Sequence, residues 1–102
     1  MHLTLGELRW RPVLDANAEM IGRVRAPLVD TETWLVDTLR IAVRRRAASE
    51  LGMTWSLFRW PTIDVATGLI HAAGDAIILR VSMAELREAA PLNTEALAAA
   101  VH

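Results

Sequence analysis

The residues from Met20 to Val43 constrain the fold more than any other part of the chain. Apolar and polar residues alternate on both sides of a single polar run at residues 30–33. Because successive side chains of a strand point to opposite faces of a sheet, this period of two predicts two strands with a short turn between them. The stretch therefore predicts a β-hairpin, and the rest of the chain must complete a sheet around it.

Two residues interrupt the alternation within the predicted hairpin. Pro27 has no backbone N–H, which places that end of the first strand at an edge or a bulge. Asp37 falls on the same side of the second strand as Leu39 and Ile41. We interpret Asp37 as a bulge residue whose carboxylate reaches water; the alternative is a buried functional carboxylate.

Further short strands are expected on both sides of the hairpin. They are marked by apolar alternation or by turn residues at their ends, and we place them at 10–14, 53–57, 69–71 and 76–81. A short helix or helical turn is expected at 44–52, because helix-forming residues there end in Gly52, which suits the C′ position.

Two helix starts follow the last predicted strand. Ser82 and Glu85 form a capping box, with Val81 and Leu86 as its hydrophobic staple. A helix is therefore expected from residue 83 to about residue 90. Asn93 is suited to cap a second helix, which would run to residue 102.

Five to six short strands followed by one or two short C-terminal helices predict a mostly β protein. We expect the strands to form a small antiparallel β-barrel, because closure leaves a sheet without exposed edges. The 102 residues are enough for one domain with one modest core. We assign residues 1–91 to the barrel domain and residues 92–102 to a C-terminal helical tail.

The order and spacing of several short motifs resemble the PRC-barrel family, named for the photosynthetic reaction-centre H subunit. The motifs lie between Arg11 and Pro91: Val13-Leu14-Asp15, Met20-Ile21-Gly22-Arg23-Val24, Leu28-Val29-Asp30 with Glu32-Thr33, the strand from Leu35 to Ile41, Trp60-Pro61, and Gly74-Asp75 leading through Ile77 and Val81 to Ser82, Glu85-Leu86 and Ala90-Pro91. Ala18 and Trp34 depart from the pattern, since the family tends to have glycine at both positions.

This resemblance implies a PRC-barrel-like fold and a binding or assembly module. Family members include the H subunit, the C-terminal domain of the ribosome maturation factor RimM, and many short stand-alone proteins. The resemblance offers no catalytic residues. Neither the specific role of the H subunit nor that of RimM is carried over to this chain.

Composition narrows the classes of function. The net charge of -1 gives no electrostatic reason to expect a nucleic-acid or membrane partner for the chain as a whole. The absence of cysteine excludes disulfides, thiol catalysis and thiolate metal sites. No run approaches the roughly 18 apolar residues of a membrane span, so we expect a cytoplasmic protein with no membrane span. All 11 basic residues are arginine, which is typical of a GC-rich, bacterial genome.

The chemistry-bearing residues do not show the spacing of a catalytic, cofactor or metal site. The three histidines, His2, His71 and His102, lie far apart in the sequence. The serines have no nucleophile-elbow context. Acidic pairs such as Asp30 with Glu32 are common in turns for backbone reasons. We therefore expect no enzyme activity, no cofactor and no metal.

Two apolar features are candidates for a protein interface. Trp34 falls at the hairpin turn, where residues are normally small and polar, so we expect it at the surface or in an interface; the alternative is the core. The last predicted helix has an apolar side made by Leu97, Ala100 and Val101, which docks either on its own barrel or on another subunit. With four tryptophans and 53% hydrophobic residues, the chain has more apolar surface than one small core holds, which favours a homodimer.

A set of arginines is the other candidate surface. Its members are Arg23, Arg25, Arg40, Arg44, Arg45 and Arg46. A basic stripe of this kind contacts phosphates or an acidic protein; the alternative is an ordinary solvent-exposed surface. The first functional hypothesis is thus a non-catalytic protein-interaction or assembly module acting as a homodimer, its protein partner unknown. The alternative is an RNA- or ribonucleoprotein-associated accessory factor.

Overall fold

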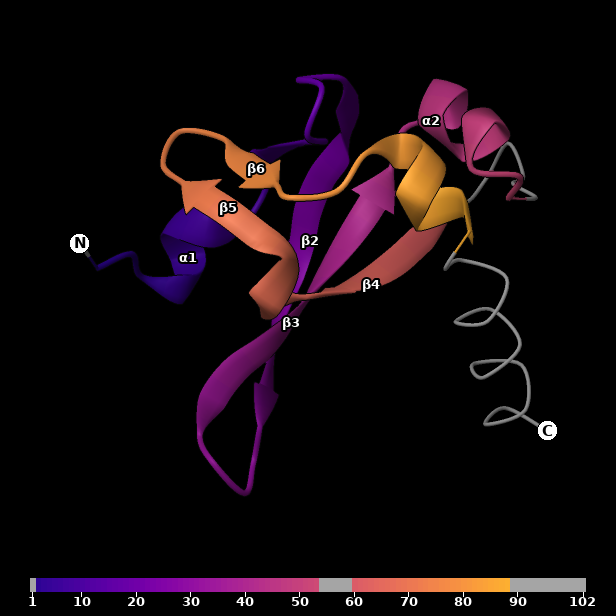
Figure 1. The fold of residues 1–102 in the computed structure, drawn as a ribbon. Helices are drawn as coiled ribbons and strands as arrows, with labels where there is room; N and C mark the ends of the chain where they lie inside the picture. The colour runs from indigo at the N-terminus through magenta and orange to yellow at the C-terminus, as the bar shows by residue number, and fades with distance from the viewer. Residues whose placement is uncertain (1, 54–59, 89–102) are drawn as a thin grey trace, which may run out of the picture.

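The computed structural model of the protein describes residues 2–53 and 60–88 (Figure 1). The elements in chain order are α1 (Leu5–Leu8), β1 (Pro12–Leu14), β2 (Met20–Asp30), β3 (Leu35–Val43), α2 (Arg45–Glu50), β4 (Thr62–Ala66), the 3-10 turn η1 (Thr67–Leu69), β5 (Ile70–Ala73) and β6 (Ile77–Leu79). Residues 83–88 form a further helix after the last strand. The protein is mostly β, as its sequence predicts.

The predicted hairpin is confirmed as the longest pair of strands among the described residues. β2 and β3 pair antiparallel from Gly22 opposite Val43 to Asp30 opposite Leu35. They lie at the centre of a six-stranded sheet with the order β4-β3-β2-β1-β6-β5. The hairpin therefore organises the sheet, and shorter strands are added on both sides of it.

The described sheet is not entirely antiparallel as predicted, and its closure into a barrel is not confirmed. β1 and β6 pair in parallel, with Val13 opposite Ile77, whereas all other neighbours in the described sheet are antiparallel. The sheet is also open, because β4 and β5 are its two edge strands and are not paired with each other. A parallel pair needs a long crossover connection, and local alternation carries no information about such a crossover.

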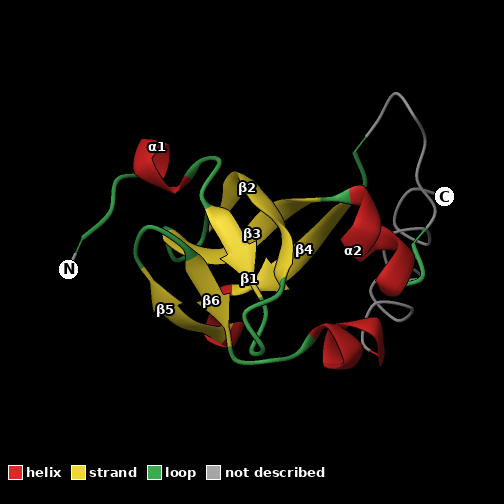
Figure 2. Cartoon of the chain, turned by 90° about the horizontal axis from the view of Figure 1, so that it is seen from above, coloured by secondary structure: helices red, strands yellow, loops and turns green. Residues whose placement is uncertain are grey.

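The open sheet is nevertheless strongly curled (Figure 2). Its edge strands β4 and β5 are separated in the chain only by the three residues of η1. The four residue steps from Ala66 to Ile70 span at most about 14 Å, whereas the edges of a flat six-stranded sheet lie roughly 24 Å apart. The short connection therefore forces the two edges towards each other.

Several sequence predictions change in position. The first strand begins at Pro12 rather than at Trp10, because Trp10 has a left-handed backbone with φ 64°. β4 was not predicted, whereas the strand expected at 53–57 falls largely outside the described residues. The strands expected at 69–71 and 76–81 correspond to β5 and β6.

The helix α2 ends as its sequence predicts. Gly52 has a left-handed φ of 72°, and its N–H donates to the carbonyl oxygen of Ser49 at 3.1 Å. The next amide, that of Met53, donates to the carbonyl oxygen of Ala48 at 2.9 Å. These two bonds form a Schellman motif with glycine at C′.

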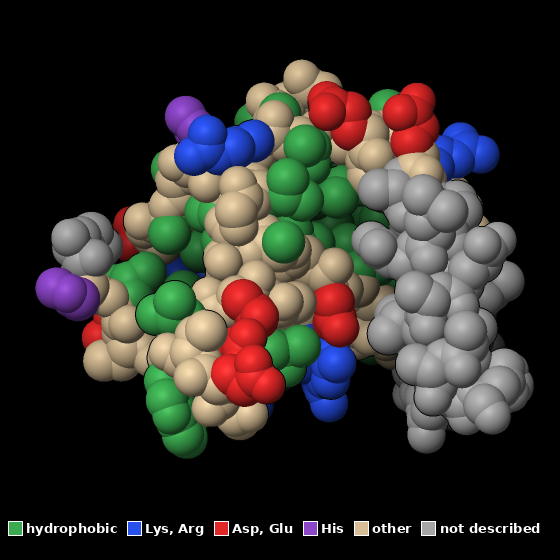
Figure 3. Space-filling view, turned by 60° about the horizontal axis from the view of Figure 1, so that its bottom comes forward, with side chains coloured by type: hydrophobic (Ala, Val, Ile, Leu, Met, Phe, Trp, Pro, Cys, Tyr) green, Lys and Arg blue, Asp and Glu red, His purple; other side chains and the backbone are tan. Residues whose placement is uncertain are grey.

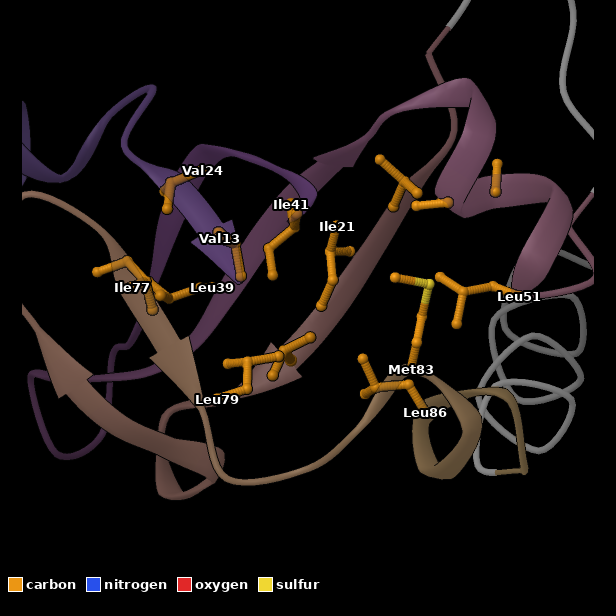
Figure 4. Packing of buried hydrophobic residues seen from close by; sticks show 14 residues of the cluster. Val13, Ile21, Val24, Leu39, Ile41, Leu51, Ile77, Leu79, Met83 and Leu86 are labelled. Carbon is orange, nitrogen blue, oxygen red and sulfur yellow. The ribbon is translucent and has the colours of Figure 1, made fainter. Parts of the chain in front are cut away.

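The hydrophobic core fills the concave side of the sheet and continues between α2 and the helix at 83–88 (Figure 4). Its buried members are Val13, Ile21, Val24, Leu39, Ile41, Val43, Ala47, Ala48, Leu51, Val65, Ile77, Leu79, Met83 and Leu86. Gly22 lies in this layer without room for a side chain, because a Cβ there would come within 2.0 Å of the carbonyl oxygen of Ala42. The close approach of β2 and β3 at this point therefore requires glycine.

Asp15 connects the first turn to the helix at 83–88. Its side chain is buried, and Oδ1 accepts hydrogen bonds from the backbone N–H groups of Asn17 and Glu19, both at 2.9 Å. Oδ2 accepts from the N–H of Met83 at 2.8 Å. The predicted capping box is confirmed beside it, since Ser82 Oγ accepts from the N–H of Glu85 at 3.2 Å. Asp15 therefore supplies a second acceptor to the start of this helix.

Candidate functional site

The end of the β2–β3 hairpin projects from the sheet as a two-stranded arm, which comprises residues 26–38 (Figure 1). On the outer side of β2, the last backbone bonds to the body of the protein are made by Val24, which pairs with Trp10 and Arg11. On the outer side of β3, the ladder with β4 ends at Thr38. Apart from a contact of η1 with Val36, no further element among residues 2–53 and 60–88 pairs with the outer edges of the arm. An isolated two-stranded ribbon is at best marginally stable in water, so the arm is weakly supported by its neighbours.

Two bulges lie near the base of the hairpin arm. The register between β2 and β3 shifts once at Arg25 and once at Asp37, so that each of these residues is an extra one in its strand. Both side chains are exposed. The prediction that Asp37 is a bulge residue open to water is therefore confirmed. Bulges increase the local twist of a ribbon and bend it, which directs the arm away from the sheet.

The tip of the arm is a four-residue turn ordered by hydrogen bonds to the backbone. The N–H of Trp34 donates to the carbonyl oxygen of Asp30 at 2.7 Å. The carboxylate of Asp30 accepts a hydrogen bond from the N–H of Glu32 at 2.8 Å. The hydroxyl of Thr33 accepts one from the N–H of Leu35 at 3.3 Å. Trp34 closes the turn with a φ of 60°, a left-handed conformation that favours glycine.

Trp34 is also the most exposed large apolar side chain of the described residues, with 76% of its surface accessible. Leu35 is 65% exposed, and Val29 on the facing strand is exposed as well. The sequence left two positions open for Trp34, and the structure confirms the surface position and not the core. A bulky residue at this position costs free energy through its backbone conformation and again through its contact with water.

An apolar groove lies beside the base of the hairpin arm, where the curled sheet stays open. Its volume is about 270 Å³. It is lined by Leu3, Leu8, Val36, Leu39, Thr67, Ile70, Ala73 and Ile77. The hydroxyl of Thr67 donates a hydrogen bond to the carbonyl oxygen of Val36 at 3.2 Å, which holds η1 against β3 at one end of the groove. The groove was not predicted from the sequence, because it exists only where the two edges of the sheet meet.

The hairpin arm carries three acidic residues, two at its tip and one, Asp37, at the bulge nearer its base. Asp30, Glu32 and Asp37 all belong to this segment, and none of them has a salt bridge within the described residues. Figure 3 turns the end of the molecule that carries the tip towards the viewer and shows acidic side chains beside hydrophobic ones. The candidate interaction surface thus combines exposed apolar side chains with negative charge.

The six arginines of the predicted basic surface fall into two groups. Arg23, Arg25 and Arg40 lie on β2 and β3, and the other three lie at the start of α2. Arg40 forms a two-point ion pair with Asp64 on β4, with Nε 3.0 Å from Oδ1. This hydrogen bond and the nearby negative charge raise the pKa of Arg40 above its ordinary value. Because Arg40 is neutralised by its partner, it contributes little to a phosphate-binding surface.

The group at α2 has acidic neighbours too. Nε of Arg46 lies 3.9 Å from Oε1 of Glu50 in the same helix. A hollow of about 220 Å³ between α2 and the helix at 83–88 is lined by two arginines and two glutamates, together with apolar residues: Arg44, Arg46, Glu19, Glu50, Met20, Ala47 and Met83. Its balanced charge gives no preference for an anion.

The remaining predicted site residues are not brought together. Leu97, Ala100 and Val101 lie outside the described residues. Within residues 2–53 and 60–88, no three side chains of the metal-ligating types form a cluster. In the same part of the chain, no helix combines the length and the apolar composition needed to cross a membrane.

Comparison with protein-family models and with curated protein sequences finds no match to this chain. The fold and the surface therefore define its class by geometry alone: a small, mostly β protein with a curled open sheet, a projecting hairpin arm and an apolar groove at the base of that arm.

Proposed function

We propose that the protein is a non-catalytic interaction or assembly module that acts as a homodimer, and that the hairpin arm carries the contact. The observation behind this proposal is Trp34, a large apolar side chain that is 76% exposed at a turn position with a φ of 60°. Glycine at this position would relieve both the backbone strain and the exposure. A residue with two such costs in the free chain is one whose benefit is expected in a complex.

The surroundings of Trp34 favour the same proposal. Interface anchors are typically tryptophan, tyrosine or arginine, ringed by other contacts that exclude water. Leu35 and Val29 are exposed next to Trp34, and no other described strand pairs with the outer edges of the arm, which a partner is able to cover. A single homodimeric contact about a two-fold axis would bury two copies of this tip.

The resemblance to PRC-barrel proteins agrees with an assembly role. Ala18 and Trp34 stand where that family tends to have glycine, and both have positive φ values, of 62° and 60°. The backbone at these two turns is thus of the kind that glycine favours, which supports the resemblance. We propose accordingly a PRC-barrel-like module in which an exposed tryptophan occupies one of the glycine positions. We also propose, from the sequence argument, that the protein is cytoplasmic.

The experiment is light scattering of the wild-type chain and of Trp34→Gly at micromolar concentration. We expect the mass of a dimer for the wild type and of a monomer for the variant. Trp60→Gly is the matched control, because Trp60 is also an exposed tryptophan but lies away from the arm, next to β4. A monomeric wild type, or equal loss of the dimer in both variants, would contradict the proposal.

The alternative function is that of an RNA-associated accessory factor. It is favoured by Arg23 and Arg25, which are exposed on β2 near the base of the arm. Binding through phosphates would weaken steeply with salt, because counterions are released on binding. A gel-shift assay with structured RNA at low and high salt tests this function, and the absence of salt-sensitive binding would remove it.

A further inference from the structure

We propose that the homodimer forms reciprocally, with the Trp34 side chain of each copy inserted into the apolar groove beside the arm of the other copy. This inference rests on the proposed function and adds the surface that receives the tip. Its support is the position of the groove relative to the arm, the apolar face that connects them, and the distribution of charge along the arm.

The groove opens at the base of the arm and shares residues with it. Val36 belongs to the arm, and both Val36 and Leu39 line the groove. Each copy therefore presents a projecting anchor and a receiving surface within one short stretch of β3. A two-fold axis that brings the tip of one copy to the base of the other also brings the second tip to the first base.

The face of the arm that continues into the groove is apolar. Val29 lies directly opposite Val36 in the ladder, so both side chains are on the same face. The bulge at Asp37 changes the alternation of β3, and it thereby places Val36 on the same side as the buried Leu39. Val29, Val36 and Leu39 thus form an apolar strip on one face that runs from the arm into the groove, while the exposed bulge residue Asp37 lies beside it.

The volume of the groove suits an aromatic side chain. Apolar cavities of about 150 Å³ accommodate a benzene molecule. The groove has about 270 Å³ and is lined almost entirely by apolar residues. An indole ring is therefore of the right size and chemistry to fill it, and no side chain of the described part of the chain does so.

The distribution of charge along the arm favours a dimer in which the arms of the two copies point in opposite directions. Asp30 and Glu32 are acidic and lie at the tip, whereas Arg23 and Arg25 are basic and precede the base of the arm on β2. Asp37 at the bulge is acidic, so these two arginines leave the base with one net positive charge among the three. Side-by-side arms with parallel directions would place like charges together. Arms that point in opposite directions place the acidic tip of one copy near the basic base of the other, at the position that also brings Trp34 to the groove.

Cross-linking distinguishes this arrangement from other dimers, because the chain contains no cysteine of its own. Thr31→Cys places a thiol at the exposed tip, and Ala73→Cys places one at the exposed edge of the groove. We expect a disulfide to form on oxidation when the two variants are mixed, and to form much less in either variant alone. Cross-linking of Thr31→Cys with itself would show tips in contact and would overturn the inference.

A complementation experiment tests the same contact by affinity. Trp34→Gly removes the anchor and leaves the groove, whereas Ala73→Arg obstructs the groove and leaves the anchor. Each variant alone should weaken the dimer at least about 100-fold, because both reciprocal contacts are lost. An equimolar mixture should recover dimer in part, since one tip and one groove then remain compatible.

The outcomes separate the inference from the proposed function. A wild-type chain that is monomeric in sedimentation contradicts both. A wild-type dimer whose mixed variants neither cross-link nor complement one another contradicts only the reciprocal docking, and leaves the arm as an interface of another geometry or for another protein. Circular dichroism of each variant, compared with the wild type, establishes that the chains under test are folded.

Discussion

Replacing Asp15 with alanine should destabilise the protein more than replacing any acidic residue of the arm. The Asp15 side chain is 1% exposed and accepts hydrogen bonds from three backbone N–H groups. Two of these belong to the turn after β1, and the third belongs to the first residue of the helix at 83–88. Alanine leaves all three donors without this acceptor.

The expected magnitude follows from the surroundings of each donor. The N–H of Met83 is buried, and a buried donor without an acceptor costs about 1–3 kcal/mol. The N–H groups of Asn17 and Glu19 are partly accessible to water, so each loss costs about 0.5–1.5 kcal/mol. We therefore expect a total loss of about 2–6 kcal/mol, a large fraction of the roughly 5–15 kcal/mol by which a domain is stable.

Urea denaturation followed by tryptophan fluorescence measures this loss. Asp30→Ala is the matched control, because the carboxylate of Asp30 also accepts a backbone N–H, at 2.8 Å, but does so at the exposed tip of the arm. The control should lose less than about 1 kcal/mol. The reasoning is refuted if Asp15→Ala and Asp30→Ala have the same midpoint and slope.

Three further substitutions, with Gly68→Ala as a control for the first, test the backbone of the fold. Gly22→Ala should destabilise the protein by several kcal/mol or prevent folding, since its Cβ would lie 2.0 Å from the carbonyl oxygen of Ala42. A Cβ at Gly68 would have nothing within 4 Å, so Gly68→Ala should be tolerated. Equal stabilities of the two variants would contradict the close approach of β2 and β3 at Gly22. Ser82→Ala should cost about 0.5–2 kcal/mol through loss of the helix cap, and an unchanged denaturation midpoint would mean that Ser82 is not the cap. Ala18→Gly should raise the thermal midpoint slightly, because φ at this position is 62°, and a lowered midpoint would count against a strained turn.

Features determined by local sequence were predicted well. The hairpin follows from alternation with a period of two, and its turn and the capping box at Ser82 follow from side chains that bond to nearby backbone groups. Gly52 ends α2 for a reason contained in its own backbone preference. In each case the residues that determine the structure lie within a few positions of one another.

Features that depend on distant segments were missed. β4 has a charged residue, Asp64, at its centre, and the reason is its ion pair with Arg40 on the neighbouring strand. Asp15 reads as an ordinary turn residue until Met83 is brought next to it. The parallel pairing of β1 with β6 likewise depends on the path of the whole chain.

The candidate site was predicted only in part. Trp34 was expected to be exposed because hairpin turns are normally small and polar, and the structure places it there. The groove could not be predicted, since its residues come from α1, β3, β5, β6 and the segments next to them. The arginine surface was expected as a stripe, but the cross-strand partner of Arg40 was not apparent from the sequence.

The mass of the protein in solution tests the central claim most directly. Sedimentation equilibrium of the wild-type chain, over a wide range of micromolar concentrations, should fit a reversible monomer–dimer equilibrium. Trp34→Gly should sediment as a monomer over the same range, while Trp60→Gly should follow the wild type. A wild-type chain that sediments as a single monomeric species at every concentration would contradict the account.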